Sequence, residues 1–502
     1  MMCELIICLL VMAALIIYRW LIKDHNYWKN QGVPYLRQSF PFGNISDMIL
    51  MKKTTGEVYR DIYRMFPNQL AGGFYKFNEP MLMIRDPELI RLVMIKEFSK
   101  FSNNDFNVSK DVDPLLAINP FVTTAPEWRN IRAIQLPAQS LSKIKSMVPE
   151  MVNCSNQMIN YLKENINKPH EAKTVSGCYT GDTVAVCAFG LRSNSYSNDE
   201  PGFAAVTKGE LFGSNYWDNF SILCAMLAPK IGKLLKLRVI HKEVEDYFVK
   251  VINAASDYRI KNGIKRNDFL QQLIDTNNNS ENTKPVYNNI EMAGHCMTFY
   301  MDGYETTSLL LGFALYELAK HPEIQNEVRE EIIQISKDIN DFDVSSISSL
   351  TKLDNVVSET LRLHPPIQAV TRICSEDTTL ECKGQKYHIR KGMSVVIPIY
   401  ALHTDPENFP EPELFNPERF NKQNKPLIKK FTYIPYGEGP RICIGIRFAL
   451  TQVKLAMIAI LLKFRILLNE AQDGPIKLDP RNTFLHTPNG GLWLRFEDWD
   501  DL

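Results

Sequence analysis

The sequence predicts a mainly α-helical protein with a small β portion, preceded by one N-terminal transmembrane anchor helix. Three observations support this prediction: an apolar N-terminal run, long segments with helical periodicity, and one β-like segment near residue 390. Of the 502 residues, 45% are hydrophobic and 23% are charged, which is typical of an ordered globular protein. The 57 basic residues balance 57 acidic ones, which argues against nucleic acid as a partner.

The first 22 residues form the most apolar segment. Leu5–Tyr18 is an unbroken apolar run, and three further apolar residues follow Arg19. A helix over this segment would be about 30 Å long, enough to cross the hydrocarbon core of a bilayer. Glu4 precedes the run and basic residues follow it, which favours an uncleaved anchor over a removed signal peptide and leaves the rest of the chain in the cytosol. We predict an anchor over residues 1–22, a proline-containing connector over 23–44 and one large domain over 45–502.

The clearest helix signal covers residues 289–320. The segment is apolar around most of its circumference, which predicts a helix through the core, and His321-Pro322 ends it. A charged amphipathic segment follows at 323–339, and the apolar spacing over 350–363 predicts another helix. Valines, isoleucines and a Lys-Gly turn make 386–403 β-like, and residues 482–497 are interpreted as a hairpin about Pro-Asn-Gly-Gly.

One of the ten cysteines stands in an unusual setting. The chain has no C-x-x-C pair, so neither a disulfide framework nor a cysteine zinc site is indicated, and most cysteines are expected to be buried small hydrophobes. Cys443 instead lies among glycines just before a helical segment. The N-terminus of that helix is expected to lower the pKa of the thiol. A thiolate beside a flat, glycine-lined surface is what axial ligation of haem iron requires.

The same segment carries a family resemblance. Residues 436–445, YGEGPRICIG, resemble the haem-binding motif F-x-x-G-x-R-x-C-x-G of the cytochrome P450 family, with matches at Gly439, Arg441, Cys443 and Gly445. Tyr436 replaces the usual Phe, and its hydroxyl could alter electron donation by the sulfur. The resemblance implies the cytochrome P450 fold, with haem b as cofactor and Cys443 as its axial ligand.

A second match concerns structural support for the haem pocket. The E-x-x-R motif of the family corresponds to Glu359–Arg362. Two neighbouring sequences single out this pair: LRLHPP, which contains Arg362, and further along the chain FNPERF, which contains Arg419. The motif is weak, because Glu57–Arg60 and Glu88–Arg91 have the same spacing. The resemblance implies a buried cluster of Glu359, Arg362 and Arg419 that supports the pocket and takes no part in the chemistry.

Further matches imply the rest of the haem site. Trp128 and Arg132 resemble the W-x-x-x-R motif that approaches a haem propionate, and Arg372 and Arg441 match other propionate-binding arginines. The family pattern [A/G]-G-x-[D/E]-T-T corresponds to residues 302–307, so the resemblance implies that Glu305 and Thr306 deliver protons to dioxygen beside Gly303. Asp302 stands where a small residue is expected, and could narrow the pocket.

Taken together, the matches imply a haem-thiolate monooxygenase of the microsomal class, most similar to the insect detoxification type. It would act on small apolar substrates such as xenobiotics, lipids or hormones with O2, in the endoplasmic reticulum membrane and facing the cytosol. The sequence has no nucleotide-binding loop, so electrons from NADPH are expected through NADPH-cytochrome P450 reductase, with cytochrome b5 as a further candidate partner. The rival interpretations are a haem-thiolate isomerase or dehydratase that needs no O2 or reductase, and a non-catalytic haem-binding protein.

Two sets of contact residues are expected by analogy. A docking face for the reductase is expected at basic residues around the cysteine loop, namely Lys422, Lys425, Lys429, Lys430 and Arg447. Residues 220–242 could dip into the membrane or form a packed helix pair. The candidate substrate contacts are Phe106, Phe121, Phe299, Ile367, Ala369, Val370 and Leu485.

Overall fold

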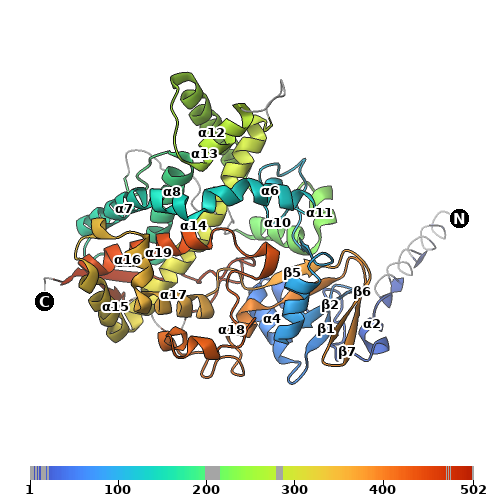
Figure 1. Cartoon of the computed structure of the whole chain (residues 1–502). Coiled ribbons are helices and arrows are strands. Elements are labelled where there is room, and N and C mark those ends of the chain that lie inside the picture. The colour runs from blue at the N-terminus through green and yellow to red at the C-terminus, as the bar shows by residue number, and fades with distance from the viewer. Residues whose placement is uncertain are drawn as a thin grey trace.

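The computed structural model describes residues 22–197, 215–278, 286–470 and 476–499, with Leu5, Cys8, Val11, Met12, Tyr18, Arg19, Gln472 and Gly474. Helices gather on one side of the molecule and the strands of the main sheet on the other (Figure 1). The predicted mainly helical fold with a small β portion is confirmed. Among the described residues no helix combines the length and the hydropathy needed to span a bilayer. Most of the predicted anchor lies outside the described residues.

The helices occupy most of the chain. They are α2 (Tyr27–Asn30), α3 (Ser46–Ile49), α4 (Thr55–Arg64), α5 (Pro87–Arg91), α6 (Glu127–Gln135), α7 (Leu141–Glu164), α8 (Ala172–Phe189), α10 (Tyr216–Leu227), α11 (Pro229–Leu234), α12 (Lys242–Asn262), α13 (Phe269–Asn278), α14 (Asn289–Lys320), α15 (Pro322–Ile335), α16 (Val344–Ser349), α17 (Thr351–Leu363), α18 (Ile399–His403) and α19 (Ile446–Lys463). Short 3-10 or π turns are η1 (Leu92–Lys96), η2 (Leu116–Ile118), η3 (Leu136–Gln139), η4 (Ile339–Asp341), η5 (Pro417–Phe420), η6 (Lys425–Leu427) and η7 (Gly439–Arg441).

The long helix α14 forms the centre of the helical part (Figure 1). Its bounds, Asn289–Lys320, confirm the prediction. Asn288 caps the first turn and forms a capping box with Glu291, which satisfies backbone N–H groups that have no partner within the helix. Nearly all of its side chains are buried, and it packs against α8, α12, α17 and α19. A helix that is apolar on all sides is stable only inside a core, and α14 has that position.

The strands form three small sheets. They are β1 (Ala71–Lys76), β2 (Glu79–Ile84), β3 (Asn103–Asn104), β4 (His170–Glu171), β5 (Val370–Ile373), β6 (Thr378–Cys382), β7 (Gln385–Ile389), β8 (Ser394–Ile397), β9 (Phe464–Leu468) and β10 (Trp493–Asp498). The largest sheet has the order β1-β2-β8-β5-β3; β4-β10-β9 and β6-β7 form the others. In the largest sheet, the described strands β2 and β8 form a parallel pair, with Leu82 opposite Val395. Arg372 of β5 lies opposite Val395, and Val370 begins the same strand, so this sheet carries two predicted site residues.

Two of the β predictions were wrong. Residues 482–497 do not form a hairpin: β10 pairs with β9 and β4, whereas Leu485 forms an isolated bridge with Ile367. The positive φ angles of Gly490 and Gly491 do make a turn, but long-range pairing decides the partner of each side. At the end of the β-like segment, Ile399–His403 is helix α18, because Pro398 ends the strand and the helix buries its apolar face against α4.

The predicted connector is part of the core of the sheet region. Trp28 of α2 is fully buried, its Nε1–H donates to Phe74 O at 3.4 Å, and its ring lies where a side chain on Gly73 would clash. Tyr35 forms a parallel bridge with Gly73, which lies in β1. Residues 27–35 of this connector are therefore fixed to the sheet.

Candidate active site

The loop that carries Cys443 is a tight turn between η7 and α19. The Cys443 N–H donates to Tyr436 O at 3.0 Å, and the Gly437 N–H donates to Ile434 O at 3.0 Å. Gly439 has a φ of 73°, and a Cβ at this position would lie 2.1 Å from the carbonyl oxygen of Met94. No other residue fits there, because both the backbone conformation and the space exclude a side chain. The loop thus holds Cys443 three residues ahead of the first residue of α19.

The Cys443 thiol is accessible, yet the chain surrounds it. Cys443 is exposed, whereas burial raises the pKa of its thiol to about 11, against the lowering effect of the Gly445 N–H. The expectation of a lowered pKa was therefore wrong for the polypeptide by itself, because desolvation outweighs the contribution of the helix N-terminus. Asp302 of α14 raises this pKa further and Arg132 lowers it, so both groups lie near the sulfur. A thiol that is both accessible and desolvated opens onto an enclosed space.

Three arginines face the same region without a carboxylate partner. Arg132 of α6, Arg372 of β5 and Arg441 of η7 form no ion pair within the described part of the chain. Burial lowers the pKa of Arg372 to about 10. Burial, with repulsion from Arg372 and Arg132, lowers the pKa of Arg441 to about 9. The Nε atoms of Arg372 and Arg441 are buried, and no described residue offers either of them a hydrogen bond.

Trp128 and two backbone carbonyls orient Arg441. Its guanidinium lies over the Trp128 ring at 4.4 Å and donates to Pro120 O at 2.6 Å and to Thr123 O at 2.8 Å. Arg132 lies 6.0 Å from the same ring. A desolvated cluster of cations needs a negatively charged ligand. The cluster therefore fits the two carboxylates of a haem, and the accessible Cys443 thiol fits its iron.

On α14, the two residues with implied catalytic roles point in different directions. The Thr306 hydroxyl donates to the carbonyl oxygen of Asp302 at 2.6 Å, and Thr306 remains partly accessible. Glu305 is buried and forms an ion pair with Lys173 in the first turn of α8. Gly303 lies where α8 approaches closely, since a Cβ there would be 3.0 Å from a methyl of Val184.

The ion pair between Lys173 and Glu305 gives a stability prediction. We expect Lys173→Met to lower the free energy of unfolding by about 1–3 kcal/mol, because it leaves a buried carboxylate without its cation. Thermal or urea unfolding measures the change. In a double-mutant cycle, Glu305→Gln with Lys173→Met should cost less than the sum of the two single changes. Additive costs would show that the pair does not interact.

Tyr436 has a buried hydroxyl with no hydrogen-bond partner among the described residues. We expect Tyr436→Phe to leave the free energy of unfolding unchanged or to raise it by about 1 kcal/mol, because a desolvated unpaired hydroxyl is unfavourable. Tyr433 offers a matched control, since its hydroxyl donates to Ser358 O at 3.0 Å. Tyr433→Phe should therefore cost about 0.5–1.5 kcal/mol. Equal losses in both variants, measured by thermal unfolding, would contradict this account of Tyr436.

The candidate substrate contacts fall into separate groups. The rings of Phe106 and Phe121 are 5.9 Å apart, and each lies 5.5 Å from Phe484, which the sequence analysis missed. Ile367 and Leu485 are brought together by their bridge, beside Ala369 and Val370 at the start of β5. The Phe299 ring instead packs against Phe269 and Phe448, within the core between α13, α14 and α19.

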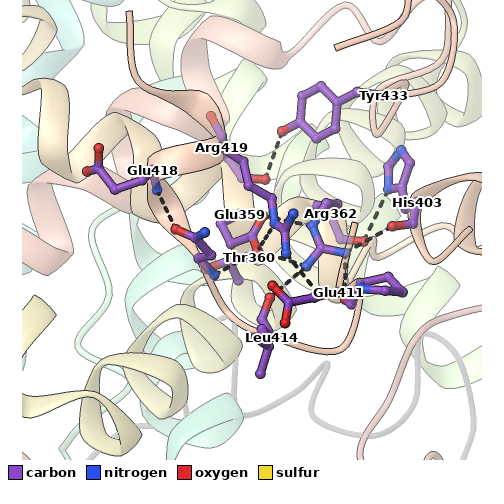
Figure 2. Close-up of polar contacts among 12 residues, drawn as sticks. Glu359, Thr360, Arg362, His403, Glu411, Leu414, Glu418, Arg419 and Tyr433 are labelled. Carbon is purple, nitrogen blue, oxygen red and sulfur yellow. Dashed lines mark hydrogen bonds and ion pairs between the residues drawn. The ribbon is translucent and has the colours of Figure 1, made fainter. Parts of the chain in front are cut away.

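Glu359 and Arg362 form a bidentate ion pair that is completely buried in α17 (Figure 2). The two N···O distances are both 2.7 Å. Arg419 approaches the same carboxylate at 3.3 Å, so the three residues of the implied cluster lie together. Such a pair is favourable only when the remaining donors and acceptors are also satisfied.

Those remaining donors tie α17 to the chain that leads to the cysteine loop. Arg362 donates to the carbonyl oxygens of His403 at 2.9 Å, Pro412 at 2.8 Å and Leu414 at 3.1 Å (Figure 2). Burial and Arg362 lower the pKa of His403 to about 3, so its ring is neutral and its Nε2 accepts from the Ile434 N–H at 3.0 Å. The cluster thus holds residues 403–434 in place, immediately before the Cys443 loop.

Several partners could not be found from the sequence. Lys173 lies 132 residues from Glu305 and Asn119 lies 183 residues from Asp302, and neither belongs to a recognisable motif. His403 is a further long-range partner, since its ring is hydrogen-bonded both to Arg362 O of α17 and to the Ile434 N–H. No local pattern marks such long-range contacts.

Comparisons with known proteins agree with this geometry. The family model for cytochrome P450 matches residues 46–495. The chain is 32% identical to cytochrome P450 6j1 of Blattella germanica over 502 residues, covering 99% of this chain and 98% of that protein. It is 30% identical to the probable cytochrome P450 9f2 of Drosophila melanogaster over 506 residues, covering 97% and 98%. The chain therefore belongs to the cytochrome P450 family of haem-thiolate monooxygenases and is most similar, among the relatives compared, to insect members.

Proposed function

We propose that this chain is a membrane-anchored microsomal monooxygenase that hydroxylates or epoxidises small apolar substrates, with Cys443 as the axial ligand of haem b. The observation that carries this proposal is one accessible, desolvated thiol beside three arginines, the buried Arg372 and the partly buried Arg132 and Arg441, that have no acidic partner among the described residues. Thiolate-ligated haem supplies the activation of O2, because the thiolate donates electron density that favours O–O cleavage.

The residues around Cys443 divide the task of holding haem. Gly445 leaves room where a flat group would approach the backbone, since a Cβ placed there would have no described atom within 4 Å, whereas Gly439 lets the loop pack against the backbone of Met94. Arg132, Arg372 and Arg441 would bind the two propionates, and Trp128 supports Arg441 from beneath. Metal coordination would deprotonate the thiol despite its raised pKa, because a bound cation stabilises the thiolate directly.

Thr306 and Glu305 would supply protons in two stages. The accessible Thr306 hydroxyl would donate a proton to oxygen at the site. Buried Glu305 would then resupply the site with protons from the side of α8. Lys173 supports this role, since it is partly exposed at the surface and in contact with Glu305. The direction of Glu305 towards α8 thus suits a relay from solvent and not direct contact with substrate.

Electrons would come from NADPH through NADPH-cytochrome P450 reductase, with cytochrome b5 as a second candidate donor. Supporting this, the basic residues around the cysteine loop are all exposed, and they are Lys422, Lys425, Lys429, Lys430 and Arg447. A partner with an acidic face would dock there near the thiol.

The endoplasmic reticulum membrane is the proposed location, with the catalytic domain in the cytosol. Besides the apolar first segment, helices α10 and α11 support membrane contact. Tyr216, Trp217 and Leu234 are 70%, 66% and 80% exposed, and α11 has no buried residue. Exposed aromatic and leucine side chains beside lysines are typical of a segment that dips into a bilayer interface.

Reconstitution tests the proposed reaction. The full chain, loaded with haem and combined with reductase and NADPH, should oxidise members of a panel of apolar ethers, lipids and terpenoids under labelled O2. We expect one labelled oxygen atom in each hydroxylated or epoxidised product and the other in water. Rearrangement of a lipid hydroperoxide without NADPH or O2, and no NADPH-dependent product, would instead indicate the isomerase or dehydratase.

A further inference from the structure

Asp302 is an acidic residue on the accessible face of α14. It is exposed, whereas its neighbours Met301 and Tyr304 are buried. The carboxylate also raises the pKa of Cys443, which places it near the thiol. Thr306, one helical turn later, shares this face of the helix. Asp302 therefore contributes a carboxylate to the space in which a substrate would lie.

One oxygen of this carboxylate is fixed by a neighbouring loop. Asp302 Oδ1 accepts a hydrogen bond from Asn119 Nδ2 at 3.0 Å. Asn119 is itself buried, and its Oδ1 accepts from the Phe121 N–H at 2.7 Å. Because the Phe121 N–H can only donate, it sets the orientation of the Asn119 amide and so makes Nδ2 face the carboxylate. The position of Asp302 is thus determined by two successive hydrogen bonds.

The second oxygen has no partner among the described residues, and no described lysine, arginine or histidine forms an ion pair with Asp302. The missing ion pair distinguishes Asp302 from Glu305, which lies one turn further along α14 and is paired with Lys173 of α8. Burial raises the pKa of Asp302 to about 6 and the Asn119 hydrogen bond lowers it, so the group is mainly ionised at neutral pH. An ionised, partly desolvated carboxylate without a counterion favours a cationic ligand.

The aromatic residues linked to this carboxylate through Asn119 suit such a ligand. Phe121, joined to Asp302 through Asn119, packs against Phe106 at 5.9 Å and Phe484 at 5.5 Å. Phe121 and Phe484 are only half-buried, so part of each ring is accessible. Aromatic rings attract organic cations as well as apolar groups. A carboxylate and a set of aromatic rings together form a site for a cation with an apolar body.

We propose that Asp302 is a specificity-determining residue that binds the positively charged nitrogen of amphipathic organic amines, whose apolar part packs on Phe106, Phe121 and Phe484. This inference rests on the proposed monooxygenase function and narrows its substrates from apolar molecules in general to a class that includes organic cations. Asn119 is a positioning residue, because it acts only by orienting the carboxylate.

Two ligands of almost the same shape test this inference. The cation is trimethyl(2-phenylethyl)ammonium, which carries a permanent charge and has no lone pair to bind iron, and (3,3-dimethylbutyl)benzene is its neutral isostere. Equilibrium dialysis against the haem-loaded full chain gives the Kd of each, without NADPH, reductase or turnover. We expect Asp302→Asn to raise the Kd of the cation about 10- to 100-fold and to change that of the isostere less than about threefold.

Two further variants separate charge from position. Asp302→Glu keeps the charge and should retain most of the preference for the cation, whereas Asn119→Ala should weaken cation binding by less than Asp302→Asn does. An Asp302→Asn variant that binds the cation as tightly as the native protein would overturn the inference. Parallel weakening of both ligands would also overturn it, by showing a change of shape and not of charge.

The native protein supplies an independent result if the variants do not load haem. It should bind the cation at least as tightly as the isostere, whereas a purely apolar site would favour the isostere because of the cost of desolvating a charge. Preference for the isostere would overturn the inference, while leaving the monooxygenase function intact. Conversely, a protein that binds the cation selectively but shows no NADPH-dependent turnover would refute only the proposed function.

Discussion

Replacing Glu359 with glutamine is expected to lower the free energy of unfolding by about 3–5 kcal/mol. The change leaves the fully buried Arg362 guanidinium without the carboxylate that neutralises it at 2.7 Å. Because Arg362 also holds three backbone carbonyls of the segment that leads to the Cys443 loop, the variant should bind haem poorly as well. Urea unfolding followed by circular dichroism, together with the ratio of haem to protein, measures both effects.

Glu88 and Arg91 provide a matched control for this change. They have the same E-x-x-R spacing and the same bidentate arrangement, with N···O distances of 2.8 and 2.5 Å, but both side chains are exposed. Glu88→Gln should leave stability and haem content unchanged, because water solvates the freed arginine. Equal effects of the two substitutions would mean that burial does not determine the importance of the Glu359 cluster.

Replacing Cys443 with alanine is expected to abolish NADPH-dependent oxygenation while leaving the polypeptide folded. The sulfur accepts one hydrogen bond, from the Gly445 N–H, and the loop itself is held by the backbone bond from Cys443 to Tyr436. The stability should therefore change by no more than about 1 kcal/mol. Product formation in the reconstituted system and thermal unfolding give the two results. Cys178→Ala, at a half-buried thiol in α8, should preserve turnover and serves as the control.

The parts of the fold that could be predicted from the sequence depend on local patterns. Helix α14 was predicted to its ends, because its apolar composition and its His321-Pro322 stop both lie within one segment. The hairpin at 482–497 was predicted wrongly, because its turn is local but its strand pairs with Phe464–Leu468. Likewise, the segment after Pro398 has β-forming residues, but it becomes helical where it packs on α4.

The candidate site likewise has features that motifs predict and features that depend on long-range contacts. The resemblance to the cytochrome P450 family implied a cluster of Glu359, Arg362 and Arg419, and the structure has these three residues in one cluster. The helix N-terminus led to a prediction of a low thiol pKa for Cys443, but burial raises this pKa, and so does Asp302, which is 141 residues away in the sequence. The partners of Asp302 and Glu305, which are Asn119 and Lys173, could not be predicted, since nothing in a single sequence records contacts across more than 100 residues.

The central claim is that Cys443 ligates haem iron through its thiolate. The most direct test is the difference spectrum of the reduced, carbon monoxide-bound full chain, recorded for the native protein and for Cys443→Ala. We predict that the native protein shows the Soret band characteristic of thiolate ligation and that the variant lacks it. A thiolate-type band that persists in Cys443→Ala, or a native spectrum without this band, would contradict the claim.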